Sequence, residues 1–354
     1  MNESHDATPN RACCDQKTVN CKNSWYRNPV FIALLGTALI WVSGDIFPSV
    51  KPFSAAYFDY LNKIWWAILL GFIFGGAIDY YIPRAYISKY LASTRKRTIL
   101  SAVGLGFLMS ACSHGIIALT MELHKKGASG PAAVSFLLAS PWANFPMTLM
   151  LIGFFGWKGF VIIISALVVA IITGFVFQIL DRKNMIEKNK NTVDVGPDFS
   201  VREDIAKRLK NYRFSMKSFI EDMKGVLRGG YELSEMVLGW LFLGMLFASA
   251  ASVFVPQHIF HHYFGPSVLG LLMTIAAATV IEVCSEGTSP LAFEIYKQSG
   301  AFGNAFVFLM GGVITDYTEI ALVWVNIGRR TAIWMVLVTL PQVLALGWLY
   351  NLIF

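Results

Sequence analysis

Hydrophobic residues in this chain form long stretches that are separated by short polar segments. A helix that crosses the hydrocarbon core of a bilayer needs about 20 apolar residues. Seven stretches predict such helices, near residues 29–47, 62–82, 132–153, 158–180, 236–256, 301–325 and 331–353. Two further apolar stretches, 98–124 and 265–296, are interrupted by small and polar residues. The pattern predicts an all-α polytopic membrane protein in which some helices are broken.

The composition supports this interpretation. Of 354 residues, 55% are hydrophobic and only 14% are charged, whereas about 25% are charged in an ordinary soluble domain. This argues against a cytosolic enzyme and against a nucleic-acid-binding protein. The net charge of +7 is therefore interpreted as membrane topology, and the expected partners are the lipid bilayer and a small-molecule substrate, with no nucleic acid. The sequence leaves the oligomeric state open, a homo-oligomer included.

The basic residues predict how the chain is oriented. They concentrate around 83–97, in the stretch 181–235 with twelve Lys and Arg residues, and at Arg329–Arg330. Cytoplasmic loops are enriched in Lys and Arg, so these segments are placed on the cytoplasmic side of the cell membrane. The N-terminus is then cytoplasmic and the C-terminus lies outside. The predicted organisation is a polar tail (1–28), a first membrane half (29–180), a basic cytoplasmic linker (181–235) with some amphipathic helix, and a second membrane half (236–354).

An internal repeat relates the two membrane halves. Cys112-Ser113-His114-Gly115 recurs as Cys284-Ser285-Glu286-Gly287, at an offset of 284−112=172 residues. The same offset relates Asn144 to Asp316. We interpret this as a duplicated unit.

Charge placement predicts how the two units are related. If 98–124 simply crossed the membrane, the twelve basic residues of 181–235 would lie outside. A hairpin that enters and leaves on one side, with its break at the Cys-Ser-x-Gly element, keeps all basic loops inside. The halves are then inverted repeats after one extra N-terminal span. A rival interpretation with the same parity puts the break between Pro141 and Pro146, and the sequence does not separate the two.

Inverted repeats with interrupted helices are typical of secondary transporters, which bind substrate near the bilayer midplane at the repeat interface. The alternative is that the small residues only serve close helix packing. The predicted substrate-binding residues are Cys112, Ser113, His114, Gly115, Asn144, Cys284, Ser285, Glu286, Gly287 and Asp316.

The chemistry of these side chains indicates two properties of the substrate pathway. Thiolates at Cys112 and Cys284 would select soft acceptors such as a trivalent arsenical. Ionisable residues inside a membrane segment are functional candidates by default. Glu286, His114, Asp316 and Glu319 are therefore predicted to carry coupling protons.

The remaining features add little chemistry. Cys13, Cys14 and Cys21 in the tail are weak candidates for capturing a soft metal. No GxxxxGK[ST], HExxH or GxSxG motif occurs, so neither an enzyme nor a cofactor is expected.

The chain resembles the predicted permease family that includes the trivalent organoarsenical efflux permeases. The resemblance covers most of residues 60–353 and depends on the paired Cys-Ser-x-Gly elements, the turn at 126–128 and the run 136–144. It implies export of a small solute across the cytoplasmic membrane, driven by an ion gradient. His114 stands where a second Cys is frequent in the family.

The leading hypothesis is a gradient-driven efflux permease for a thiophilic solute. The alternative is a passive channel, or a membrane subunit of a larger complex without coupling of its own. A metal sensor that uses the cysteine tail is a third hypothesis.

Overall fold

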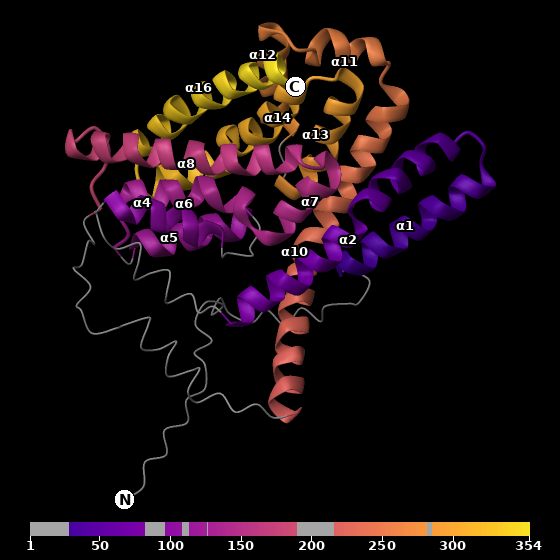
Figure 1. Cartoon of the computed structure of the whole chain (residues 1–354), viewed down its shortest axis with the longest axis horizontal. Helices are drawn as coiled ribbons and strands as arrows, with labels where there is room; N and C mark the ends of the chain where they lie inside the picture. The colour runs from indigo at the N-terminus through magenta and orange to yellow at the C-terminus, as the bar shows by residue number, and fades with distance from the viewer. Residues whose placement is uncertain (1–27, 82–95, 108–112, 126, 190–215, 282–284) are drawn as a thin grey trace, which may run out of the picture.

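The computed structural model describes residues 28–81, 96–107, 113–125, 127–189, 216–281 and 285–354, and within these ranges all secondary structure is helical (Figure 1). In chain order the helices are α1 (Pro29–Ile46), α2 (Lys51–Tyr81), α4 (Lys96–Phe107), α5 (Ser113–Lys125), α6 (Gly130–Ala143), α7 (Phe145–Phe155), α8 (Lys158–Arg182), α10 (Met216–Phe254), α11 (Gln257–Phe264), α12 (Val268–Ile281), α13 (Ser285–Ser299), α14 (Phe302–Thr315), α15 (Tyr317–Asn326) and α16 (Arg329–Ile353).

The expected polytopic membrane architecture is confirmed. Among the described residues, six helices or helix pairs are long and apolar enough to cross a bilayer, and two bent pairs bring the number to eight. The predicted span 132–153 is one of these pairs, α6 and α7, which bend by 47°. The other pair, α11 and α12, bends by 104°. The interval between the predicted span 236–256 and the interrupted stretch 265–296 is thus occupied by the short helix α11.

Two helices are longer than the hydropathy pattern predicts. α2 begins at Lys51 rather than near 62, and α10 begins at Met216, inside the expected linker. The 39 residues of α10 correspond to roughly 58 Å at 1.5 Å per residue, about twice the hydrocarbon thickness. Its first turns extend away from the other helices (Figure 1). The hydropathy pattern identifies only the apolar segment of a helix. It does not show that the helix continues into a polar segment.

Helix boundaries recur at the offset that the sequence motifs define. Adding 172 to the bounds of α6 gives 302 and 315, which are the bounds of α14. The same addition takes the first residue of α5 to that of α13, the first of α4 to 268, where α12 begins, and the first of α7 to 317, where α15 begins. The two halves therefore share their helix pattern as well as their motifs.

Packing follows the same correspondence. α6 packs against α4, α5 and α8, and α14 packs against α12, α13 and α16. Between the halves, α7 packs against α13, and α15 packs against α5. Helices α13 and α5 thus each contact the second helix of an interrupted pair, α6–α7 or α14–α15, in the opposite half of the chain.

The matched first helices, α2 and α10, run antiparallel. A Cβ on Gly76 would lie 2.3 Å from the carbonyl oxygen of Val226. Tyr80 donates to Asp222 at 3.0 Å, while Tyr57, near the other end of α2, packs edge-on against Phe242. As residue numbers rise along α2, the residues that they contact on α10 have falling numbers, so the two helices are antiparallel.

The matched last helices, α8 and α16, are also antiparallel. At the start of α8, the ammonium of Lys158 lies 5.0 Å from the ring centre of Phe354, directly after α16. It also donates to Tyr296 at 2.8 Å. Beyond the end of α8, Glu187 accepts hydrogen bonds from the backbone amides of Arg330 and Thr331, at 2.9 and 3.0 Å. The two ends of α8 are therefore held to opposite ends of α16.

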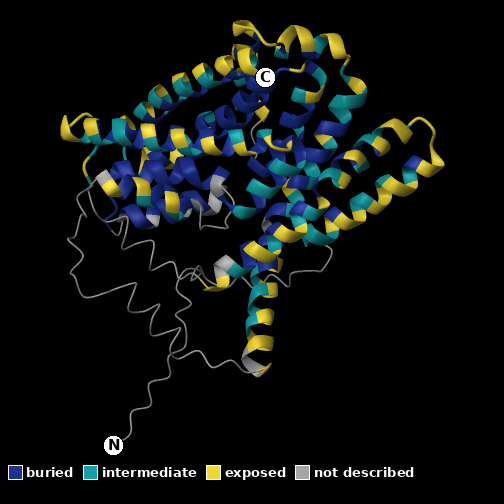
Figure 2. Cartoon of the chain, viewed as in Figure 1, coloured by how far each residue is buried: buried dark blue, intermediate teal, exposed yellow. Residues whose placement is uncertain are grey.

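The core lies on the matched pair α6 and α14. Residues 130–142 and 302–314 are buried without exception (Figure 2). Polar side chains in α6 bond to their own helix, as Ser135 and Ser140 do to the carbonyls of Pro131 and Phe136. Large apolar side chains such as Leu39, Ile164 and Leu337 are exposed on the outer helices. This distribution suits a protein whose surrounding solvent is lipid.

Glu187 caps the N-terminus of α16 in a way that depends on its charge. Burial alone would raise the pKa of its carboxyl group, but hydrogen bonds from the amides of Arg330 and Thr331 and from the Thr331 hydroxyl outweigh it and hold the pKa below its ordinary value of 4.5. Gly328 leaves room for this carboxylate, since a Cβ there would lie 2.2 Å from it.

We expect Glu187→Gln to destabilise the protein at pH 7 by about 1 kcal/mol, as loss of a helix cap does. Because the folded-state pKa is depressed, the stabilisation is complete above pH 4.5 and is lost as the pH falls through the folded-state value. The wild type should approach the variant under acid conditions. Thermal unfolding in detergent at several pH values measures this. Asp45→Asn, at an exposed position, is the control and should shift stability by less than about 0.5 kcal/mol. A constant difference at all pH values would contradict the prediction.

Candidate substrate site

The helix pairs α6–α7 and α14–α15 are each interrupted at a buried capping residue. Asn144 accepts a hydrogen bond from the amide of Met147 at 2.7 Å and so caps α7. Asp316, the matched position (144+172=316), accepts from the amide and the hydroxyl of Thr318 at 2.7 and 2.8 Å and caps α15. Both side chains are at most 7% exposed. A helix interrupted inside a membrane needs such partners, because its first amides lose their carbonyl acceptors.

The break between Pro141 and Pro146, one of the two sequence interpretations, is therefore present in the structure. It lies in a helix pair that is long enough to span. The two interpretations are compatible, since the Cys-Ser-x-Gly elements also fall at the starts of helices, α5 and α13.

The first turn of α13 carries the second Cys-Ser-x-Gly element. Ser285 and Glu286 are buried, with exposed fractions of 0% and 2%. The Ser285 hydroxyl donates to Glu286 at 3.1 Å, and Ser289 donates to the carbonyl of Ser285 at 2.8 Å. An N-terminal helix turn favours negative charge because its amide groups point outward from the end. The position therefore suits a buried carboxylate.

Gly287 brings α13 against α10. A Cβ on Gly244 of α10 would lie 1.8 Å from the carbonyl oxygen of Gly287. Only two glycines allow this approach. The crevice beside them, which Trp240 and Thr288 also line, holds about 20 Å³, enough for a single water molecule. The contact between α10 and α13 is therefore close at this turn.

The turn lies next to the break in the other half of the chain. Ser289 donates to the thioether sulfur of Met147 at 3.6 Å, and both side chains are fully buried. Met147 belongs to the first turn of α7, which Asn144 caps. Helix α13, which begins with the predicted site residues 285–287, and helix α7, which follows Asn144, are therefore in contact across the halves.

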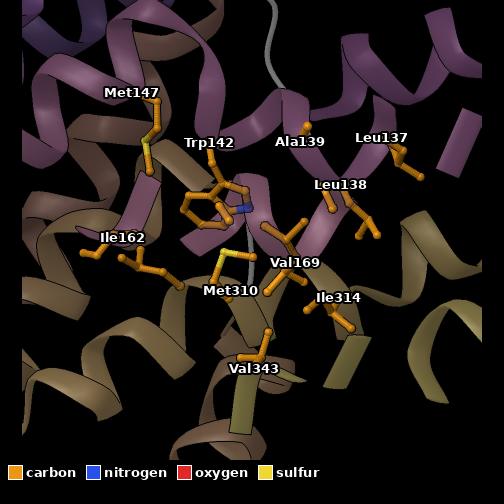
Figure 3. Packing of buried hydrophobic residues seen from close by; sticks show 14 of the residues in the cluster. Leu137, Leu138, Ala139, Trp142, Met147, Ile162, Val169, Met310, Ile314 and Val343 are labelled. Atoms are coloured by element: carbon orange, nitrogen blue, oxygen red, sulfur yellow. The ribbon is translucent and has the colours of Figure 1, made fainter. Parts of the chain in front are cut away.

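An indole group adjoins the same break. Trp142 is completely buried, and Figure 3 shows it in the core beside Met310 and Val169. Its Nε1 has no hydrogen-bond partner among the described residues. The sequence analysis did not single it out, because a tryptophan in an apolar run resembles any core residue.

The other predicted site residues divide into three groups. Asp316 and Glu319 are buried at the start of α15. Ser113, His114 and Gly115 form the first turn of α5, for which the backbone is described. Cys112, Cys284 and the tail cysteines Cys13, Cys14 and Cys21 lie outside the described residues. No group of three His, Cys, Asp or Glu side chains suited to a metal ion occurs within the described ranges.

A second buried carboxylate on α13 escaped the sequence analysis. Glu294 is completely buried and accepts hydrogen bonds from Tyr60 of α2 and, at 2.6 Å, from Gln298. The repeat contained a signal for it, because Glu122 and Lys125 recur as Glu294 and Lys297 at the same offset of 172.

These features define the class of protein: a multi-pass membrane permease whose helices are broken at buried polar residues. The chain belongs to the predicted permease family, whose model matches residues 54–352. The family suggested by the sequence resemblance is therefore confirmed.

Three relatives illustrate the range of the family. A Mycobacterium tuberculosis protein named as a permease is 24% identical over 66% of this chain and 60% of its own length. The Bacillus subtilis protein YcgR is 23% identical over 74% of this chain and 84% of its own. A Streptococcus mutans protein named as a subunit of a two-component membrane permease complex is 23% identical over 72% of this chain and 80% of its own. No solved structure matches the chain.

The close contact of α10 with α13 makes a specific prediction about glycine. Gly244→Ala should destabilise the protein by about 1–3 kcal/mol, because its Cβ would meet backbone, which cannot rotate away as a side chain does. Gly104→Ala is the matched control, since a Cβ at this exposed helix position meets nothing within 4 Å. It should be neutral or slightly stabilising. Thermal unfolding of both variants in detergent measures this, and equal stabilities would show that α10 and α13 are less closely packed.

Proposed function

We propose that this protein is a gradient-driven permease of the cell membrane that exports a small thiophilic solute, such as a trivalent organoarsenical. The substrate site lies where the two halves meet, and it comprises Cys112–Gly115, Cys284–Gly287, Asn144 and Asp316. The observation that supports the proposal is the contact between Ser289 of α13 and Met147 of α7, which joins the helix that begins at Ser285 in one half to the helix that Asn144 caps in the other.

The inverted arrangement of the repeats is part of this proposal. It is supported by the constant offset of helix boundaries and by the antiparallel course of α2 with α10 and of α8 with α16. Two copies related by an axis in the membrane plane run in opposite directions, as these pairs do. In such folds the substrate site lies at the repeat interface, at the ends of discontinuous helices.

Soft-ligand chemistry favours a thiophilic solute. In the sequence, Cys112 and Cys284 stand one residue before Ser113 and Ser285, where α5 and α13 begin. Thiolates bind soft acceptors. Glu286, His114, Asp316 and Glu319 are the candidates for moving the coupling proton. The N-terminus is placed in the cytoplasm and the C-terminus outside.

Expression in an arsenic-sensitive bacterial strain tests the substrate. The wild type should raise tolerance to methylarsenite, and Cys112→Ala or Cys284→Ala should return it to the level of the empty vector, since each removes one thiolate. Cys21→Ala, in the tail, should keep the tolerance. Equal protein levels in the membrane fraction are required for the comparison. No gain in tolerance by the wild type would end the arsenical proposal.

A second candidate function is a membrane subunit of a larger complex without coupling of its own. The name of the Streptococcus relative favours it. So do the exposed apolar side chains of Met216, Phe219 and Leu227 on the part of α10 that extends beyond its membrane-spanning segment, where a partner could pack.

Solute flux into vesicles of purified protein separates the two functions. For a proton-coupled permease, an imposed pH gradient should drive accumulation, and Glu286→Gln should reduce the gradient-driven part at least tenfold because Gln cannot bind the proton. Glu232→Gln, at an exposed position on α10, is the control and should behave as wild type. Flux that is indifferent to the gradient and to Glu286→Gln would favour the channel or subunit.

A further inference from the structure

Glu294 lies in an environment built to hold a carboxyl group. Its side chain is completely buried in α13, where an uncompensated charge is costly. One oxygen accepts from the hydroxyl of Tyr60, which is also completely buried, and the other accepts from Gln298 at 2.6 Å. Helices α2 and α13 therefore both contribute hydrogen-bond donors to this single group.

Beside the buried carboxyl group lie charged side chains that reach water. Lys297 lies 4.0 Å from Glu294 and 3.8 Å from Asp59 of α2. Asp59 also pairs with Lys63 at 2.5 Å. The side chains of Lys297 and Asp59 are 43% and 46% exposed. One side of Glu294 is thus sealed by core residues, and the other adjoins solvated charges.

The other elements packed against α13 bring few titratable groups. α7 and α14 contain no Asp, Glu, Lys, Arg or His. α11 carries His258, His261 and His262, all exposed. From α8, Lys158 bonds to Tyr296 of α13. α10 has no ionisable residue after Glu235. The charged groups nearest to Glu294 are therefore those of Asp59, Lys63 and Lys297.

We propose that Glu294 is a proton-binding residue that takes up and releases protons through the exposed charges of Asp59 and Lys297. The step is simple: a proton from the adjoining water adds to the carboxylate, and no other bond changes. The Tyr60 hydroxyl donates to the carboxylate and can accept from the protonated acid. Lys297, placed between two carboxylates, keeps Asp59 as its partner when Glu294 is neutral. Lys297 therefore has a carboxylate partner whether Glu294 is charged or neutral.

This inference rests on the proposed function for its purpose. Glu286 lies eight residues earlier on the same helix, roughly 12 Å away at 1.5 Å per residue. α13 thus carries one buried carboxyl group at the proposed substrate site and another next to solvated charges. In the predicted topology, the end of α13 near Glu294 and the start of α2 both face the outside, so Glu294 exchanges the coupling proton with the outer solution.

Infrared difference spectroscopy of the protein in lipid vesicles, titrated with acid, tests the proposal without any substrate. The wild type should show titrating bands of buried carboxyl groups, to which Glu286, Asp316 and Glu319 can also contribute, and Glu294→Gln should remove one component, the Glu294 band. Tyr60→Phe keeps the carboxyl group and the ring but removes a donor to the charged form, so the band should titrate at higher pH. Glu232→Gln is the control and should leave the band unchanged.

Two outcomes would overturn the inference: carboxyl bands in Glu294→Gln that are identical to those of the wild type, or Tyr60→Phe bands with unchanged titration midpoints. If Glu294→Gln does not fold, Tyr60→Phe decides alone. A failure of the proposed function can be distinguished from a failure of this inference, because the spectroscopic titration uses no substrate. Its result does not depend on whether the protein transports a thiophile. Where wild type transports, Glu294→Gln should abolish the gradient-driven part. Retained coupling would refute the role in transport.

Discussion

The architecture depends on one constraint: backbone amides freed by a break in a helix inside hydrocarbon must find a partner within the protein. Asn144 and Asp316 supply that partner at matched places, each as the cap of a second half-helix. An uncapped break would leave several amides without acceptors, at a cost of several kcal/mol for each. A polar residue in the middle of an apolar stretch is therefore what allows the chain to change direction there.

Close packing around the breaks follows from this need. Half-helices that end inside the protein must be covered by neighbours, and small residues let those neighbours approach. Gly244 and Gly287 provide the contact of α10 with α13, and Gly76 and Gly230 provide that of α2 with α10. Since no water-driven hydrophobic effect holds helices together in lipid, such van der Waals contact is a main source of their association. The same contacts leave space for about one water molecule beside the α13 turn.

Much of the fold was predictable, because hydropathy reports on the bilayer directly. The stretch 158–180 became α8, and 331–353 became α16, almost residue for residue. The capped break at 144 was also visible as a matched position. Amphipathic helix was expected within 201–229, and residues 216–229 are helical. That they continue directly into the spanning part of α10 was not predictable, since their polar residues look like a linker when the partner helix α2 is unknown. The contacts between α13 and α7 were out of reach for a related reason: they join residues 142 positions apart.

The two halves share a scaffold but differ in charge where chemistry is expected. The cap is neutral at Asn144 and acidic at Asp316, while the matched residues of the paired turns are His114 and Glu286. A cap needs only an acceptor oxygen, so Asn and Asp hold the helix equally well, and the structural role does not explain the carboxylate. In contrast, Glu122 and Glu294 retain the acid in both halves. The second half thus carries buried acidic residues on α13, at Glu286 and Glu294, and at the start of α15, at Asp316 and Glu319. If α13 moves against α10, the acids that move with it experience the largest change of environment, which is the condition under which proton binding can be linked to a change of conformation.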